Sequence, residues 1–168
     1  SDDFQFYGNW IKQEAMNRIG NLYPKIEITE SMVNNIDNPR KDLLPYLGKK
    51  LTVIAWIWAR TVKSPNPTFS EIDVPLTTKF SLSIKKGKEA YIEPAIDGNR
   101  YYFKVKVGIP SDIENLQKGT RVSRGAFKCI MSGDLISYKY INNQANDGNL
   151  GQRLMAVVLE GDRKRIYL

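Results

Sequence analysis

The strongest structural constraint in this 168-residue chain is the stretch of residues 51–62. It reads Leu-Thr-Val-Ile-Ala-Trp-Ile-Trp-Ala-Arg-Thr-Val, which is rich in β-branched and aromatic residues and apolar on both faces of an extended chain. This composition is typical of a central strand. A helix is the alternative, because the run lacks strict alternation. The apolar part is far too short to cross a bilayer as a helix.

The remainder of the chain after this run also predicts an antiparallel sheet. Asp97-Gly98-Asn99 is a strong hairpin signal, and the residues that follow it alternate between apolar and basic. Loops are expected at 108–119, which contains Pro110, and at 142–149, which is polar and contains glycine. The expected strands are 80–84, 89–96, 101–107, 125–130, 135–141, 154–159 and 165–168.

The first fifty residues are expected to differ from this β region. Residues 4–20 have apolar positions with a period near 3.6 and predict a helix that packs one face on the core. Residues 25–50 include the turn signal Asn38-Pro39 and predict an irregular connection. The expected fold class is α+β, with an N-terminal helix over 1–24, an irregular connection over 25–50 and a mainly β domain over 51–168.

Charge and residue usage narrow the classes of function. The net charge is +7, with 25 basic and 18 acidic residues, which favours polyanionic partners. The chain has no His, so it lacks the commonest general base, the commonest metal ligand and the usual partner of a nucleophilic Ser or Cys. A single Cys excludes an internal disulfide, and no signal-peptide pattern is visible. These features predict a cytoplasmic location.

Several strings run almost from end to end of the chain and carry a family resemblance. They are Tyr7-Gly8-Asn9-Trp10, residues 18–24, residues 52–67, Lys85-Lys86-Gly87-Lys88, residues 151–158, residues 160–163 and residues 165–168. Together they resemble bacterial and archaeal proteins described as adenine-specific DNA methylases containing a zinc ribbon, and the run 52–67 is the most specific. The resemblance implies that this chain is an internal segment of such an enzyme. Binding of S-adenosylmethionine and the Asp-Pro-Pro-Tyr motif would then belong to the rest of the parent polypeptide.

The same resemblance implies a zinc ribbon whose cysteines would stand at Ser64, Phe69, Cys129 and Ser132. Only Cys129 is a thiol here, and structural zinc needs four thiolate or imidazole ligands. We therefore expect a degenerate ribbon without metal, in which two turns persist as β turns and Phe69 packs near Cys129. The alternative is that Cys129 is simply a small buried hydrophobic residue.

Catalytic signatures are missing from the sequence. There is no Pro-Pro dipeptide, so the motif that holds the target base in such methylases does not occur, and no glycine-rich turn could cradle a cofactor. Glu89 and Glu93 could share one face of a strand, as paired carboxylates do in glycosidases, but a solvated surface is the simpler interpretation. Cys129 has no His to activate it. The segment alone is therefore expected to be inactive and to bind no cofactor.

Nucleic-acid binding is the better functional hypothesis. Basic residues gather at expected turns and would neutralise several phosphates if the turns met in space. Trp56 or Trp58, or Tyr91 and Tyr102, could stack on an exposed base, although a tryptophan in such a strand could equally be core. A lysine-rich turn could also serve only solubility. The candidate contacts to the DNA backbone are Lys85, Lys86, Lys88, Arg121, Arg124, Arg163, Lys164 and Arg165.

The expected function is therefore that of a non-catalytic accessory segment of an adenine-specific, S-adenosylmethionine-dependent DNA methyltransferase, of the kind that acts in restriction–modification or phage defence. Its partners would be DNA and the remainder of the parent polypeptide, with no membrane. Two other hypotheses stay open. One is a protein-interaction or scaffolding module without DNA contact, and the other is a stand-alone hydrolase.

Overall fold

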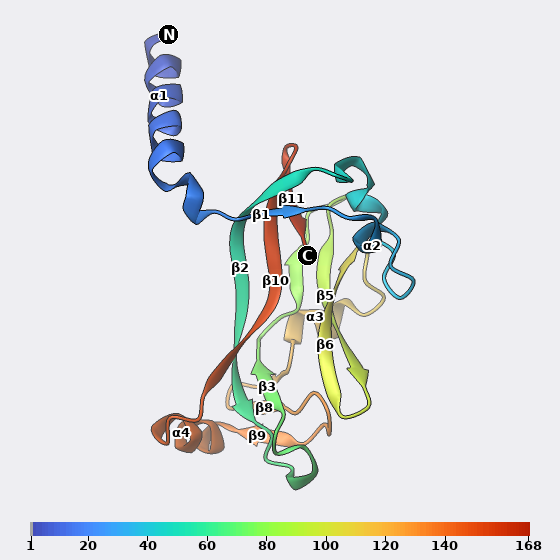
Figure 1. Ribbon diagram of the computed structural model, residues 1–168. Coiled ribbons are helices and arrows are strands. Elements are labelled where there is room, and N and C mark those ends of the chain that lie inside the picture. The colour runs from blue at the N-terminus through green and yellow to red at the C-terminus, as the bar shows by residue number, and fades with distance from the viewer. Residues whose placement is uncertain (1) are drawn as a thin grey trace.

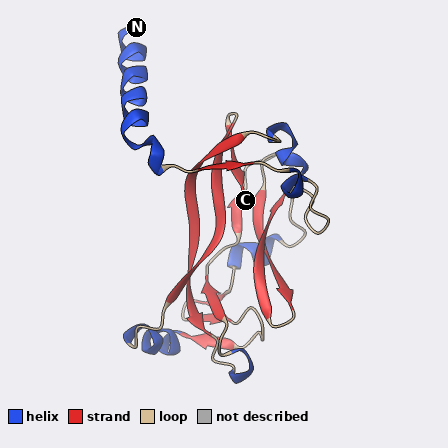
Figure 2. Ribbon diagram, viewed as in Figure 1, coloured by secondary structure: helices blue, strands red, loops and turns tan. Residues whose placement is uncertain are grey.

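Strand β2 (Lys50–Lys63) is the longest strand and the centre of the fold, as the apolar run predicts. The computed structural model describes residues 2–168 and has the predicted α+β class (Figures 1 and 2). β2 pairs antiparallel along one edge with β10, and its other edge pairs with β1 near one end and with β3 near the other. This first sheet consists of β1 (Lys25–Glu27), β2, β3 (Asp73–Leu76), β10 (Gly151–Gly161) and β11 (Lys164–Tyr167).

The two faces of β2 have different environments. Val53 and Ala59 point into buried clusters, with Ala55 and Ile57 packed against one of them. The intervening residues point to the opposite face because side chains alternate along a strand. Trp56 and Trp58 on that face are 43% and 52% exposed. The predicted central position of β2 is confirmed, and the outer face of this part of the strand is exposed although its residues are apolar.

A second antiparallel sheet packs on the inner face of the first (Figure 1). It contains β4 (Ser81–Ser83), β5 (Ala90–Asp97) and β6 (Arg100–Val107), which confirms the three expected strands. Gly98 and Asn99 form the two-residue hairpin between β5 and β6, and Gly98 has a φ of +55°, a conformation that glycine adopts readily. The core between the two sheets includes Ala59, Met155 and Val158 from the first sheet and Ile92 and Val105 from the second.

A third, small sheet closes the end of the molecule where β2 meets β3. Its strands are β7 (Arg121–Ser123), β8 (Ala126–Lys128) and β9 (Leu135–Ser137), and it packs on a cluster that includes Val62, Val74 and Ile136. The short helix η3 (Pro67–Phe69) lies in the connection between β2 and β3.

Three expectations about strands and loops around this sheet are wrong. The expected strand 135–141 ends at Ser137, and the expected loop 142–149 continues the helix α4 (Tyr138–Asn146). Ser137 caps this helix by accepting a hydrogen bond from the Tyr140 N–H, and Ile141 buries its inner face. The expected loop 108–119 contains the helix α3 (Ile113–Lys118), which Asp112 caps in the same way. In both cases a side-chain cap starts a short helix that hydrophobic periodicity alone does not reveal.

Residues 25–50 are expected from the sequence to form an irregular connection, but they contain regular elements and contribute to the core. They contain β1, α2 (Glu30–Val33) and the 3-10 helix η2 (Lys41–Tyr46). Ile28, Leu43 and Tyr46 from this segment are buried with Leu159 and Ile166 in one cluster. The segment therefore covers one end of the first sheet and is part of the folded core.

Helix α1 (Asp2–Ile19) has the predicted position but not the predicted packing. It continues into η1 (Gly20–Leu22) and projects away from the sheets (Figure 1). Its apolar side chains are exposed, including Phe4 at 85% and Trp10 at 58%. The expected docking of its apolar face on the core is wrong, and this face is open to other molecules.

Candidate nucleic-acid interface

Two of the three basic turns meet in space. The turn between β4 and β5 carries Lys85 and Lys88, and the turn between β10 and β11 carries Arg163. The Lys88 Nζ donates a hydrogen bond of 3.3 Å to the Arg163 carbonyl, across 75 residues of sequence. A pocket of about 290 Å³ lies between the turns and is lined by Lys85, Lys88, Arg163, Lys164 and Arg165, with Ser83 and Tyr167. We refer to these five basic residues as the convergent patch.

Local geometry holds both turns in place. The first turn closes through a 2.8 Å hydrogen bond from the Lys88 N–H to the Lys85 carbonyl, and Gly87 supplies a φ of +74° between them. In the second turn Arg163 has a φ of +54°, which is uncommon for a residue with a side chain. The Asp162 N–H beside it donates to the hydroxyl of buried Tyr46 at 3.1 Å. The second turn is therefore anchored to the core through the segment 25–50.

Tyr46 also extends the patch. The Nζ atoms of Lys49 and Lys164 lie 5.6 Å and 5.5 Å from the centre of its ring, within the range of a cation–π contact. Lys49 is thus a further candidate for phosphate contact that sequence reasoning missed. No signal marks it, because its relation to the turn depends on how residues 25–50 pack. Lys86 lies exposed on the first turn without lining the pocket.

Acidic residues limit the patch on one side. A smaller neighbouring pocket of about 130 Å³ is lined by Lys88, Lys164 and Arg165 together with Asp42 and Glu89. Arg40 Nε lies 2.8 Å from Asp42 Oδ1, so the Arg40 guanidinium already balances the charge of the Asp42 carboxylate. The convergent patch therefore keeps an excess of positive charge that an anion could neutralise.

The third basic turn lies at the other end of the molecule. Arg121 and Arg124 flank the connection from β7 to β8, which lies opposite β11 along the length of β2 (Figure 1). The Arg121 Nε donates to the Ser123 carbonyl at 3.0 Å, and neither arginine lines the pocket of the convergent patch. The structure therefore does not unite all eight predicted phosphate contacts in one surface.

The four positions that the resemblance assigns to ribbon cysteines are only partly brought together. Ser64 Oγ lies 3.3 Å from Cys129 Sγ, and both residues are buried. A hydrogen bond of 2.6 Å from Asn66 Nδ2 to Asp134 Oδ2 joins the same two turns. This hydrogen bond holds the pKa of the Asp134 carboxyl below its ordinary value, and the Ser132 side chain adds to the effect.

The environment of Cys129 differs from the expected one. The side chains packed in its cluster include Val62, Val74 and Ile136, and Phe69 is not among them. The expectation that Phe69 fills the space near Cys129 is therefore wrong, because β2, β3 and β9 already supply the apolar contacts. Burial raises the pKa of the Cys129 thiol, but hydrogen bonds from Ser132, Ser64 and nearby backbone outweigh this effect, and the pKa is lowered overall. Among residues 2–168, no three His, Cys, Asp or Glu side chains cluster in a way that could hold a metal ion.

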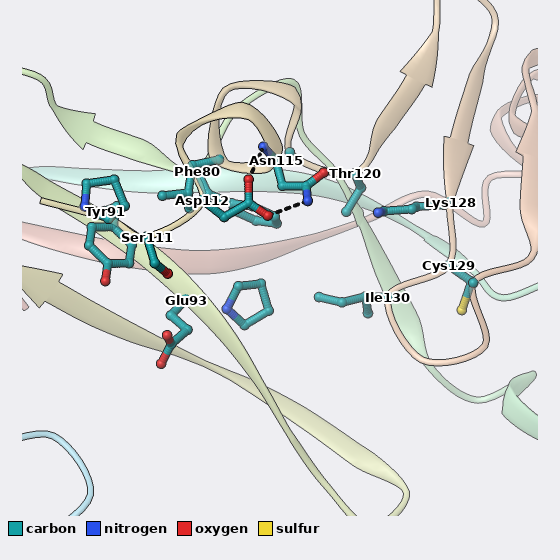
Figure 3. A pocket seen from close by; sticks show the side chains of 15 residues that line it. Phe80, Tyr91, Glu93, Ser111, Asp112, Asn115, Thr120, Lys128, Cys129 and Ile130 are labelled. Atoms are coloured by element: carbon teal, nitrogen blue, oxygen red, sulfur yellow. Dashed lines mark hydrogen bonds between the residues drawn. The ribbon is translucent and has the colours of Figure 1, made fainter.

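Cys129 also lines a pocket of about 410 Å³, together with Asp112, Glu93 and Tyr91 (Figure 3). Its carboxylates already have partners. The Asp112 carboxylate accepts hydrogen bonds from the backbone and the side chain of Asn115, and these bonds lower the pKa of Asp112. Glu93 Oε2 lies 3.7 Å from Lys106 Nζ. Burial, and then the charge of Glu93, raise the pKa of Tyr91. The buried Cys129 thiol bonds to Ser64 outside this pocket, so the lining offers no nucleophile paired with a base.

No family model, curated protein or solved structure matches this chain. Within residues 2–168, no helix has both the length and the hydrophobicity needed to cross a bilayer. The geometry of the convergent patch is therefore the principal guide to function.

Proposed function

We propose that this chain is a non-catalytic DNA-positioning segment that holds the phosphate backbone through the convergent patch. The observation that carries the proposal is the meeting of two lysine- and arginine-rich turns at the Lys88–Arg163 contact. Single basic turns are common on protein surfaces. Two such turns anchored side by side concentrate positive charge where one phosphodiester chain could lie against both.

The chemistry of the patch suits phosphate groups. Arg163 and Arg165 can each present a planar guanidinium to two phosphate oxygens, while Lys85 and Lys88 act as compact point charges. The patch exposes no Asn or Gln that would read an adenine edge. In this proposal its lysines and arginines contact phosphates, and such contacts fix the position of a duplex without selecting its sequence.

The parent enzyme is part of the same proposal. The strings quoted above resemble adenine-specific DNA methylases, which supports DNA as the polyanion and a cytoplasmic location. In this proposal the remainder of the parent polypeptide binds S-adenosylmethionine and carries out methyl transfer. The buried pairing of Ser64 with Cys129 is compatible with a vestigial ribbon that packing now stabilises.

Charge reversal at two positions tests the proposal. The variant Lys88→Glu/Arg165→Glu removes one cation from each turn, and two lost ion pairs at about 1 kcal/mol each predict a roughly 30-fold weaker affinity for a duplex. The matched control is Arg121→Glu/Arg124→Glu, which makes the same change of charge at the other end of the molecule. Fluorescence anisotropy with a labelled duplex at one ionic strength measures the affinity of both double variants and of the native chain. An equal loss of duplex affinity in the two variants would show that binding depends only on net charge, and would refute the convergent patch as the binding surface.

A second candidate function has its own observation in favour. The exposed apolar side chains of α1, together with Trp56 and Trp58, suit a protein-interaction module without DNA contact. Under this alternative the chain would show no salt-sensitive duplex binding, and substitutions in the convergent patch would leave partner binding unchanged.

A further inference from the structure

A separate pocket lies at the end of the molecule that carries α4. Its volume is about 450 Å³, within the range of small-molecule sites. The outer face of β2 forms one wall and α4 another, with β3 and β8 completing the lining. The residues important for its chemistry are Trp58, Arg60, Phe127, Tyr138 and Asn142.

Three polar side chains of this pocket have no hydrogen-bond partner among residues 2–168. Among residues 2–168, the Arg60 guanidinium makes no salt bridge or hydrogen bond, and the side chains of Asn142 and Tyr138 make no hydrogen bond. The lining contains no Asp or Glu. A cation, an amide and a phenol are therefore available to a ligand in one place.

Two aromatic side chains of this pocket, Trp58 and Tyr138, are unusually exposed to solvent. Trp58 is 52% exposed and Tyr138 is 55% exposed, although large aromatic rings are normally well buried. Trp56, which is 43% exposed, continues the same face of β2 two residues before Trp58. These rings would present a stacking surface that leads into the pocket.

Both walls are held rigidly. Trp58 pairs with Leu154 of β10, and Arg60 pairs with Leu76 of β3 and Gln152 of β10. Tyr138 and Asn142 are four residues apart and so lie on one side of α4. The helix is fixed by the Ser137 cap, by buried Ile141 and by a 3.2 Å hydrogen bond from the Tyr140 hydroxyl to the Lys63 carbonyl.

We propose that this pocket binds an unpaired nucleobase and its phosphate. The base stacks on Trp58 and Tyr138, the Asn142 amide donates to and accepts from its edge, and Arg60 binds the adjoining phosphate. An amide can make this paired contact with the donor and acceptor of a base edge, and every base has a face that can stack. This inference rests on the proposed function and extends it from a duplex backbone to an exposed base.

The position of the pocket fits that extension. The convergent patch lies at the end of the first sheet near β11, and the pocket lies near α4 at the opposite end (Figure 1). The outer face of β2 runs along the length of the first sheet, so a nucleic acid that reaches from the patch to the pocket could lie against it. Trp56 lies on that path.

The test uses the full 168-residue chain, a labelled single-stranded oligonucleotide, the same oligonucleotide with abasic sites, and a free nucleoside monophosphate. We expect the intact strand to bind more tightly than the abasic strand. Trp58→Ala should weaken binding of the intact strand by about 5- to 150-fold, the range expected for loss of one stacked base. The same substitution should leave abasic binding unchanged. Binding of the monophosphate by the pocket would identify a free nucleotide as a sufficient ligand and support the assignment.

Two controls keep the result interpretable. Trp56→Ala removes a similarly exposed tryptophan from the same strand but outside the pocket, and should have the smaller effect. Asn142→Ala, on an exposed position of α4, should reduce discrimination between intact and abasic strands without unfolding the chain. Equal affinity of the native chain for intact and abasic strands, with no binding of the monophosphate, would overturn the inference. If Lys88→Glu/Arg165→Glu leaves duplex binding unchanged while Trp58→Ala still abolishes the preference for intact strands, the patch fails and the pocket stands.

Discussion

Replacing Arg40 tests whether the segment 25–50 holds the two main sheets together. Arg40 is only 5% exposed and forms hydrogen bonds of 2.8 Å to both carboxylate oxygens of Asp42. It also donates to the Tyr167 carbonyl of β11 at 2.7 Å and to the Val105 carbonyl of β6 at 3.4 Å. One side chain therefore connects the segment 25–50 with both main sheets.

The expected loss of stability follows from these partners. Arg40→Met would leave the Asp42 carboxylate without its counter-charge and would remove the donor that Arg40 provides to the Tyr167 carbonyl. The Val105 carbonyl would keep its 3.0 Å hydrogen bond from Asn38 Nδ2. Removing one member of a buried ion pair costs about 3–5 kcal/mol. In a domain of this size each kcal/mol lowers the melting temperature by about 2–4 °C, so the expected decrease is about 6–20 °C.

Thermal and urea unfolding, followed by circular dichroism, measure this effect. The double variant Arg40→Met/Asp42→Leu removes the unpaired charge and should recover much of the loss, because the remaining cost is mainly the hydrogen bond lost at the Tyr167 carbonyl. Arg40→Lys keeps the charge but cannot reach all the partners, and should give an intermediate result. A change of less than about 1 kcal/mol for Arg40→Met would refute the view that this contact stabilises the fold.

Three further predictions follow from other parts of the structure. Burial raises the pKa of Tyr101 to about 12, and its hydroxyl donates to the Asp73 carbonyl. Because the folded pKa lies above the unfolded value of 10.0, this group stabilises the protein below pH 10 and the stabilisation is lost as pH rises towards 12. An absorbance titration should show a step near pH 12 that becomes smaller by one tyrosine in Tyr101→Phe; a step of unchanged size in the variant would contradict the assignment. Introducing thiols with Ser64→Cys and Ser132→Cys beside Cys129 should create a three-thiolate cobalt site with charge-transfer bands, and adding Phe69→Cys should change these bands little because Phe69 lies outside the Cys129 cluster; a double variant without these bands would argue against a vestigial ribbon. Deleting residues 2–19 should change the free energy of unfolding by less than about 0.5 kcal/mol in urea titrations, because α1 does not pack on the sheets; a large loss of stability would show that α1 docks on the fold.

The β architecture was largely predictable because its signals are local. The alternation in 101–107 and the Asp97-Gly98-Asn99 turn place β5 and β6 within one residue of their observed limits at the hairpin. The short helices α3 and α4 were missed because each depends on a single capping side chain, Asp112 or Ser137. Residues 138–141 have an apolar pattern that fits a strand as well as a helix, and only packing on the third sheet decides between them.

The candidate sites were less predictable because they join distant parts of the chain. Lys88 and Arg163 could be identified as basic turn residues, but their contact follows from how the two main sheets pack. Lys49 could not be linked to them before the buried position of Tyr46 was known. Trp58 lies on a strand whose two faces are both apolar in sequence, and the pattern does not show which face stays open. Its proximity to Asn142 requires the fold of α4 against β2.

The salt dependence of duplex binding tests the central claim most directly. Five basic side chains line the convergent patch, and each phosphate neutralised on a duplex contributes about −0.9 to the slope of log affinity against log salt concentration. The native chain should therefore show a slope as steep as about −4.5, and Lys88→Gln/Arg165→Gln should reduce its magnitude by about 1.8. Arg121→Gln/Arg124→Gln should leave the slope nearly unchanged. A native slope near zero, or an equal reduction in both variants, would contradict the assignment of the convergent patch as the DNA-binding surface.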